Sequence, residues 1–384
     1  MKLYSALHSE HLRHGARFKD YFGWQVPAVY STEEEELARL RHGVAFTEYG
    51  FMNHLAVCGA DAVCLLQRTL SVNVCAHAPG RAFYALALDE AGKVLEDVIV
   101  YRLRDDAFVL SGRGRFNFRD PEQDCLLAVK QPKRWLAEAV DGRRVCVHNL
   151  GVQLISVQGP RSHDVLAPAG DVADLPYLGC KQVHLGGIPA LVARNGFSGE
   201  LGFEILVWPE YAIELWQLVE RLGQPHGIVP YGVNLLRIIG LEKGYLGGPD
   251  FYPGSTPFEL GLEWAVDLDK GEFNGKEALM ERMAKGMTTK LVGLELANPA
   301  PVAEPGGTIS LGGDPVGRVT ASGYSATVKK NLARGWVGLD QARAGTQLVV
   351  QTPGGAAAAS VAETYCWYDR AGARLAIATP PSRT

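Results

Sequence analysis

The sequence has little that would tie the protein to a membrane, to a disulfide framework or to a metal cluster. Its seven cysteines are odd in number, scattered along the chain and free of any C-x-x-C pair, so neither a disulfide framework nor a cysteine-based zinc site is expected. No apolar run approaches the roughly 20 residues of a membrane span, and the first residues lack the apolar core of a secretory signal. We therefore expect a cytoplasmic protein with no membrane partner.

Charge and motifs exclude further classes. The net charge of −4 gives no reason to expect nucleic acid as a partner. The chain has no G-x-S-x-G turn, no H-E-x-x-H helix and no P-loop lysine, which are the usual signatures of covalent, zinc or phosphate chemistry. His8, His11 and His14 recur every third residue in a predicted helix, but no neighbouring acid or cysteine completes a ligand set. A polar helix face is preferred, and no metal is predicted.

Length and patterning indicate several domains. A chain of 384 residues with 47% hydrophobic residues can bury a large core and suggests two or three domains. Helical and strand patterns are mixed up to Gly286. After it, short strands alternate with glycine-rich turns, which is typical of an all-β module. We therefore predict a domain boundary near residue 287.

The most informative stretch is AGKVLEDVIVYRL, residues 91–103. A turn at Gly92 joins it to a predicted strand over residues 81–89, so the two form a hairpin. Side chains alternate along a strand, so Glu96 and Asp97 point to opposite faces, and both faces are otherwise apolar. A buried carboxylate must find partners or neutralise. The two acids are therefore candidate catalytic groups; alternatively, both lie at the mouth of the strand and meet solvent or an arginine.

Two further stretches are candidates for ligand binding. In NGFSGELGFEI, residues 195–205, Glu200 lies at a glycine-rich bend beside Phe197, and a carboxylate next to aromatic rings suits a flat heterocycle with N–H donors. The alternative is a tight hairpin with a solvated glutamate. Arg113, at the start of an R-G-R-F segment, could grip a carboxylate or phosphate, or belong to a solvated loop. Acids and aromatics on such turns favour binding of an aromatic ligand with assisted proton transfer.

Seven segments, in order, resemble the glycine-cleavage T-proteins and their relatives, the tetrahydrofolate-dependent one-carbon transferases. The resemblance covers nearly the whole chain, and the order of the segments makes it specific. The segments are GARFKDYFGWQVP, EAGKVLEDVIVYR, VQLISVQGPRSHDVL, NGFSGELGFEI, GLEKGY followed by T-P-x-E at residues 256–259, FNGKEAL, and SATVKKNLARGWV.

The resemblance implies an α+β protein with three domains arranged as a disc around a central folate channel. It places two mixed α+β folate-binding domains at residues 1–150 and 151–286, and an all-β, barrel-like domain at residues 287–384. It also implies that the first of the two adjacent acids, Glu96, assists transfer at the folate N5 or the substrate nitrogen, and that Glu200 binds the pterin ring. Three aromatic residues match positions that line the channel: Tyr84, Tyr101 and Trp264.

The sequence also departs from the family pattern. Glu96 stands where the T-proteins have aspartate, and the asparagine expected near Ser111 is absent. Gly240 replaces an arginine of the R-L-E-x-G helix, which leaves Arg237, one turn earlier, as the cationic candidate for the folate site. The D-V-S-H-M segment is missing, and the residues in its place could line an apolar substrate pocket: Tyr49, Phe51 and Met52.

These departures favour a relative with a changed donor. We predict a tetrahydrofolate-dependent methyltransferase that demethylates a small O-, N- or S-methylated donor onto N5 of the folate. One alternative is an authentic aminomethyltransferase of the glycine cleavage system, with a lipoyl carrier protein as its partner. The other is a folate-binding accessory protein without turnover. Tetrahydrofolate is the predicted cofactor in each case.

Overall fold

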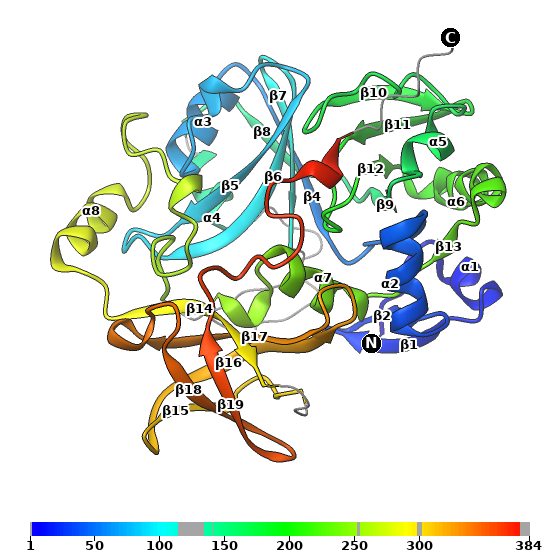
Figure 1. Cartoon of the computed structure of the whole chain (residues 1–384). Helices are drawn as coiled ribbons and strands as arrows, with labels where there is room; N and C mark the ends of the chain where they lie inside the picture. The colour runs from blue at the N-terminus through cyan, green and yellow to red at the C-terminus, as the bar shows by residue number, and fades with distance from the viewer. Residues whose placement is uncertain (1, 114–133, 141, 252–253, 298–301, 377–384) are drawn as a thin grey trace, which may run out of the picture.

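The computed structural model describes residues 2–113, 134–140, 142–251, 254–297 and 302–376. Two mixed α+β units and a β-barrel lie around a common centre (Figure 1). The predicted α+β class is thereby confirmed. In the described part of the chain, no helix has both the length and the apolar character needed to cross a bilayer.

The first sheet is antiparallel, and an α-helix covers one of its faces. The pairing of its first two strands confirms the predicted hairpin over residues 81–103. Leu65 and Leu66 of α3 (Ala62–Thr69) pack against Val98 and Val100 and bury that face. The opposite face is turned toward the second sheet. In spatial order the strands are β5 (Arg81–Leu88), β6 (Val94–Arg104), β7 (Ala107–Gly112), β4 (Asn53–Cys58) and β8 (Cys146–Asn149).

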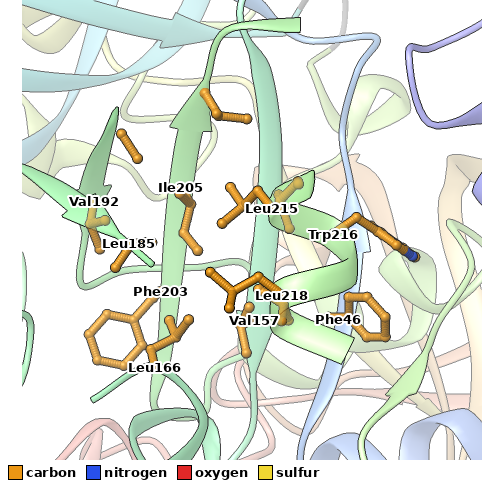
Figure 2. Close-up of a cluster of buried hydrophobic side chains, with 14 of the residues drawn as sticks. Phe46, Val157, Leu166, Leu185, Val192, Phe203, Ile205, Leu215, Trp216 and Leu218 are labelled. Atoms are coloured by element: carbon orange, nitrogen blue, oxygen red, sulfur yellow. The ribbon is translucent and has the colours of Figure 1, made fainter. Parts of the chain in front are cut away.

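The second sheet carries the largest apolar core, on the side away from the first sheet. There, Trp216 of α6 (Pro209–Gly223) packs against Phe46, and Leu215 lies beside Ile205, as Figure 2 shows. In the same core, Phe203 lies beside Leu166. The short helix α5 (Ser162–Leu166) covers the same face. In spatial order the strands are β10 (Cys180–Leu185), β11 (Ile188–Ala193), β12 (Gly202–Val207), β9 (Gln153–Gln158), β3 (Ala45–Glu48) and β13 (Val229–Pro230).

Strand β3 comes from the first fifty residues, yet it pairs with β9 and β13 of the second sheet. The two sheets therefore draw on interleaved parts of the sequence. The division at residue 150 stays a prediction. The facing sides of the two sheets meet in one apolar cluster, in which Tyr101 and Val109 of the first sheet pack with Leu191 and Leu206 of the second.

The last part of the chain closes into the predicted all-β module, a barrel of antiparallel strands. The glycine-rich turns that signalled it separate its strands. In order around the barrel these are β14 (Thr289–Leu296), β17 (Lys330–Gly338), β16 (Asp314–Ser325), β15 (Thr308–Leu311), β18 (Gln347–Thr352) and β19 (Gly355–Val361).

The remaining elements connect these units. Helix α2 (Glu33–His42) is capped by Thr32, whose side chain accepts a hydrogen bond from the Glu35 amide, and Gly43 ends the helix. Leu40 of α2 and Leu332 of the barrel pack against Ile239 of α7 (Leu235–Lys243), so α7 lies between the barrel and the second unit. The elements are α1 (His8–Arg13), β1 (Arg17–Tyr21), β2 (Trp24–Val29), α2 (Glu33–His42), α4 (Arg134–Ala137), α7 (Leu235–Lys243) and α8 (Lys276–Lys285).

A buried ion pair joins the barrel to the loop after α7. The Arg334 guanidinium lies 2.8 Å from the Asp250 carboxylate, and both side chains are almost fully buried. Arg334 also donates to the carbonyls of Gly240 and Tyr245, at 3.0 and 2.8 Å. Thr320 donates to the other oxygen of Asp250 at 2.6 Å. These contacts satisfy a charge that would otherwise be costly to bury.

Replacing Arg334 with alanine should therefore destabilise the protein strongly. The change leaves Asp250 buried without a cation, and loss of one partner of a buried pair costs about 3–5 kcal/mol. Lys330→Ala on the same strand is the matched control, because its pair with Glu295 is partly exposed and should contribute about 1 kcal/mol at most. Urea denaturation of both variants measures the difference, and equal losses would contradict this role for Arg334.

Candidate active site

Strand β6 places the two candidate acids in different environments. Glu96 shares the helix-covered face with Val98 and is buried. Its carboxylate accepts a hydrogen bond of 3.2 Å from the Trp135 indole, and it lies against Gly112, where an added Cβ would come within 2.5 Å of it. Glu96 therefore lies on the side of the sheet that faces away from the second sheet. Asp97 lies on the side that faces it.

Asp97 is held by a cation and a phenol. The Nε atom of Arg113 lies 2.7 Å from one carboxylate oxygen, and a terminal nitrogen of Arg113 donates to the other at 3.0 Å. The Tyr84 hydroxyl donates to Asp97 at 3.1 Å. Burial and the charge of Asp97 raise the pKa of Tyr84 well above its usual value, so Tyr84 remains a hydrogen-bond donor. The carboxylate is thus fixed in direction, and its side chain is still 14% exposed.

Neighbouring groups fix Arg113 in turn. It donates to the Leu246 carbonyl at 2.7 Å, and its guanidinium lies 4.5 Å from the centre of the Phe251 ring. Burial works against its charge, but Asp97 outweighs burial and raises the Arg113 pKa. Arg113 therefore forms an ion pair with a carboxylate of the protein itself. The rest of the predicted R-G-R-F grip, residues 114–116, lies outside the described residues.

A second carboxylate, Glu204 of β12, lies at the other end of the same surface. It is buried and accepts hydrogen bonds from the Tyr101 hydroxyl at 3.0 Å and the Asn195 amide at 2.8 Å, both on one oxygen. Among the described residues, none donates to its other oxygen. Burial raises the pKa of Glu204, and these hydrogen bonds oppose the rise. The Asn195 side-chain oxygen is buried, and no residue in the described part of the chain donates a hydrogen bond to it.

The spacing of these groups follows from the strand. Asp97 and Tyr101 are four residues apart on the same face of β6, which corresponds to about 13 Å along a strand. Tyr101 reaches across to Glu204 on the second sheet. Ile99 lies between them and packs in the apolar cluster at the contact of the sheets. The result is an elongated apolar surface with one carboxylate at each end.

The predicted substrate residues border this surface. The hydroxyls of Tyr49 and Tyr231 lie 2.9 Å apart, and both side chains are buried. Phe51 packs at 6.0 Å from Tyr49 and at 4.9 Å from Tyr21, measured between ring centroids. Met52 is half-buried in the same cluster. Tyr49, Phe51 and Met52 are therefore close together and lie where the two sheets meet.

Glu200 lies in a separate network. It is 2% exposed and is held by Arg41 at 2.9 Å, Arg374 at 2.8 Å and the Tyr368 hydroxyl at 2.7 Å. Arg41 also lies 2.5 Å from Glu242 of α7. Both oxygens of Glu200 thus have partners within the protein, and the glutamate ties α2 to the carboxyl-terminal segment.

The other predicted folate residues are dispersed. Tyr84 packs against Trp264 with 5.2 Å between the rings, and Trp264 is 67% exposed. Phe197 packs instead against Tyr245 at 5.0 Å. Arg237 is directed toward the barrel, where it donates to the Ser322 carbonyl. The structure thus brings Tyr84 and Trp264 to the Asp97 end and Tyr101 to the Glu204 end, but leaves Arg237 apart from both carboxylates.

The three histidines do not converge on one point. His11 lies 3.2 Å from Glu48. His14 lies with Glu10 and Glu220, and one ligand atom from each falls within 4.8 Å of the others. Arg13 already pairs with both acids, at 2.7 and 2.5 Å. The Arg13 guanidinium therefore occupies the position that a metal ion would need.

Two candidate site residues, Glu204 and Asn195, were not predicted from the sequence. Glu204 was visible as an acid within the apolar run G-F-E-I-L-V, residues 202–207, and an acid in a strand buried on both faces needs a partner. Asn195 opens the glycine-rich segment but becomes informative only once its contact with Glu204 is known. The pairing of Arg113 with Asp97 depends on tertiary contacts that no local pattern reveals.

Comparisons with known proteins agree with this architecture. A family model described as the GCVT N-terminal domain matches residues 7–270, and one described as the glycine cleavage T-protein C-terminal barrel domain matches residues 289–369. The chain belongs to the glycine cleavage T-protein family. This membership confirms the family and fold predicted from the sequence. It also makes the chain a tetrahydrofolate-dependent transferase, as predicted for the enzyme class and the cofactor.

Similar T-protein family members span almost the whole chain. An aminomethyltransferase of Symbiobacterium thermophilum is 32% identical over 372 residues, which are 93% of this chain and 95% of that protein. One of Streptomyces coelicolor is 33% identical over 350 residues, covering 89% and 91%. The crystal structure of the glycine cleavage system aminomethyltransferase T from Bartonella henselae superposes with a TM-score of 0.85 at 26% identity, covering 96% of this chain and 99% of that one.

Replacing Glu204 with glutamine should stabilise the protein at neutral pH. The raised pKa of Glu204 means that ionisation disfavours the folded state, so stability is lost as pH rises through the folded pKa. The amide removes that loss, and its oxygen can still accept the hydrogen bonds from Tyr101 and Asn195. Thermal unfolding at neutral and mildly acidic pH measures the effect, with Glu263→Gln at an exposed position as control. A less stable Glu204→Gln variant at neutral pH would refute this assignment.

Proposed function

We propose that the chain transfers a one-carbon unit from an aminomethyl group on a lipoyl carrier protein to tetrahydrofolate. The observation that carries the proposal is the pair of carboxylates, Asp97 and Glu204, at opposite ends of one surface between the two sheets. The printed names of the relatives, aminomethyltransferase in each case, favour this donor over the demethylation predicted from the sequence. Tetrahydrofolate supplies the nucleophilic nitrogen that receives the carbon.

Glu204 is suited to hold the pterin end of the folate. Among the described residues, neither the second oxygen of Glu204 nor the buried side-chain oxygen of Asn195 accepts a hydrogen bond, so both remain acceptors for a ligand. The amino-pyrimidine edge of a pterin presents N–H donors, which a carboxylate can accept in pairs. Tyr101 orients the carboxylate from the opposite sheet. Glu200 is assigned no contact with folate, because cations within the protein already hold its oxygens.

Asp97 is suited to receive a proton at the reacting end. Arg113 and Tyr84 fix the direction of its carboxylate, and a positioned carboxylate can accept the proton that leaves a nitrogen as carbon arrives. Glu96 is assigned no contact with the reacting atoms, because it lies on the far side of β6 against Trp135. Tyr84 and Trp264 form the aromatic wall beside Asp97.

The proposed reaction needs no oxidant or reductant. The carbon–sulfur bond of the aminomethyl lipoyl group breaks, the sulfur leaves as a thiol, and the nitrogen leaves as ammonia. The carbon keeps its oxidation level as it becomes bonded to the two folate nitrogens, N5 and N10. This chain's part is to anchor the pterin at Glu204, orient N5 near Asp97 and accept the proton there.

Demethylation of a small methylated donor is the second candidate. The cluster of Tyr49, Phe51 and Met52 supports it, because these side chains supply an apolar wall near the contact of the sheets. The Ser111 hydroxyl, near the missing family asparagine, lies 2.9 Å from His54 Nδ1, so the donor end of the surface differs from the family pattern.

The deciding experiment is mass spectrometry of the folate after incubation of the protein with tetrahydrofolate and one donor at a time. The donors are an aminomethyl-lipoyl carrier protein and a panel of small O-, N- and S-methylated compounds. Formation of 5,10-methylenetetrahydrofolate with the carrier is the expected result. Formation of 5-methyltetrahydrofolate with a small donor would establish the demethylase instead, and folate binding with no product would favour the accessory protein.

Asp97 and Glu96 point to opposite faces of the same strand and therefore give a matched pair of variants. Asp97→Asn should lower kcat by about 10²–10⁴-fold, because it removes the positioned proton acceptor. Glu96→Gln should have a much smaller effect, because that side chain faces the opposite side of the sheet. Turnover is measured with the productive donor, and tetrahydrofolate affinity is measured on both variants to show that the site is intact. A larger loss for Glu96→Gln would contradict the assignment.

A further inference from the structure

Two cysteines face each other at the edge of the first sheet. Cys58, the last residue of β4, pairs directly with Cys146, the first residue of β8. Residues directly opposite in an antiparallel ladder project to the same face, so the two side chains are neighbours. Both are free thiols. Strand β8 is an edge strand with β4 as its partner in the sheet.

The ladder places these residues within reach of a disulfide. The Leu150 amide donates to the His54 carbonyl at 2.8 Å, and hydrogen-bonded pairs recur at every second position, so Cys58 and Cys146 form one of them. The Cα atoms of such a pair are about 5.5 Å apart, inside the range of about 4.4–6.8 Å that a disulfide spans. Their Cβ atoms, at the wide end of about 4.5–5.5 Å for a hydrogen-bonded pair, must approach by about 1 Å or more to reach the roughly 3.5–4.5 Å of a disulfide, which requires a shift of the edge strand.

The two thiols differ in access. Cys146 is exposed and Cys58 is half-buried. The exposed thiol is open to attack by a reagent in solution, whereas the half-buried one is placed to react with its neighbour. Among the described cysteines, no other two are opposite each other in a ladder. Cys64 and Cys75 are also exposed and therefore provide internal controls for reactivity due to exposure alone.

We propose that Cys58 and Cys146 form a reversible dithiol–disulfide site that exchanges with small-molecule disulfides such as glutathione disulfide. The Cys146 thiolate attacks one sulfur of the small disulfide, breaks its S–S bond and releases one thiol. The Cys58 thiolate then attacks the Cys146 sulfur of the mixed disulfide, forms the protein S–S bond and releases the second thiol. One disulfide is reduced, one is formed, and the two cysteine protons pass to the released thiolates.

A disulfide between Cys58 and Cys146 would restrain the segment that connects the two sheets. Strand β8 leads through Leu150 and Gly151 into β9, an inner strand of the second sheet. A link from Cys146 to β4 thus holds the chain at the point where it crosses from one sheet to the other. Because the pair lies at an exposed edge and closes only when the edge strand shifts, its disulfide belongs to the readily reduced class.

The test is exposure of the folded, full-length protein to glutathione disulfide, followed by intact mass and peptide mapping. The wild type should lose the mass of two hydrogen atoms, yield one peptide that joins residues 58 and 146, and recover on reduction. Cys58→Ser should instead retain one glutathione at residue 146. Cys146→Ser should form no link, and the controls Cys64→Ser and Cys75→Ser should still form it.

Other outcomes would overturn the proposal. A wild-type protein that carries stable glutathione on Cys146 without the joined peptide has no resolving thiol. A Cys58→Ser variant that accumulates no more adduct at residue 146 than the wild type shows that Cys58 does not act there. If a variant does not fold, the peptide map of the wild type alone decides whether residues 58 and 146 become linked. A folded wild-type protein that glutathione disulfide leaves unmodified also refutes the site.

Discussion

Adjacent side chains of a strand cannot share a face, and this constraint on β6 organises the site. It sends Glu96 toward Trp135 and the helix-covered core, and Asp97 toward Arg113 and Tyr84. The same alternation places Tyr101 in line with Asp97, from where it reaches Glu204 of the second sheet. One strand thus defines both ends of the surface, and the proposed folate orientation follows from it.

Buried arginines join several other parts of the molecule to one another. Arg41 joins Glu200 and Glu242, and Arg334 of the barrel joins Asp250 in the loop after α7. These pairs satisfy their charges within the protein, so their role is to fix α2, α7, the barrel and the carboxyl-terminal segment in place. Glu204 differs because phenol and amide donors, and no cation, hold one of its oxygens. A ligand with N–H groups can donate hydrogen bonds to its other oxygen.

Much of the architecture was predictable from local pattern. The hairpin of β5 and β6, the Thr32 cap of α2 and the change to short strands after Gly286 all follow from periodicity and turn residues. The candidate site was predictable only in part. Alternation separated Glu96 from Asp97 but could not tell which face is covered by helices, because that depends on α3. Likewise, Glu200 and Glu204 lie four residues apart, and only the tertiary position of Arg41 and Arg374 distinguishes them.

The proposed function depends most on the direction in which tetrahydrofolate lies between the two sheets. A crystal structure of the complex tests this directly. The predicted result is the amino-pyrimidine edge against Glu204 and Asn195, with N5 beside the carboxylate of Asp97. A pterin bound at Glu200, or one whose N5 lies nearer to Glu204 than to Asp97, would contradict the central claim.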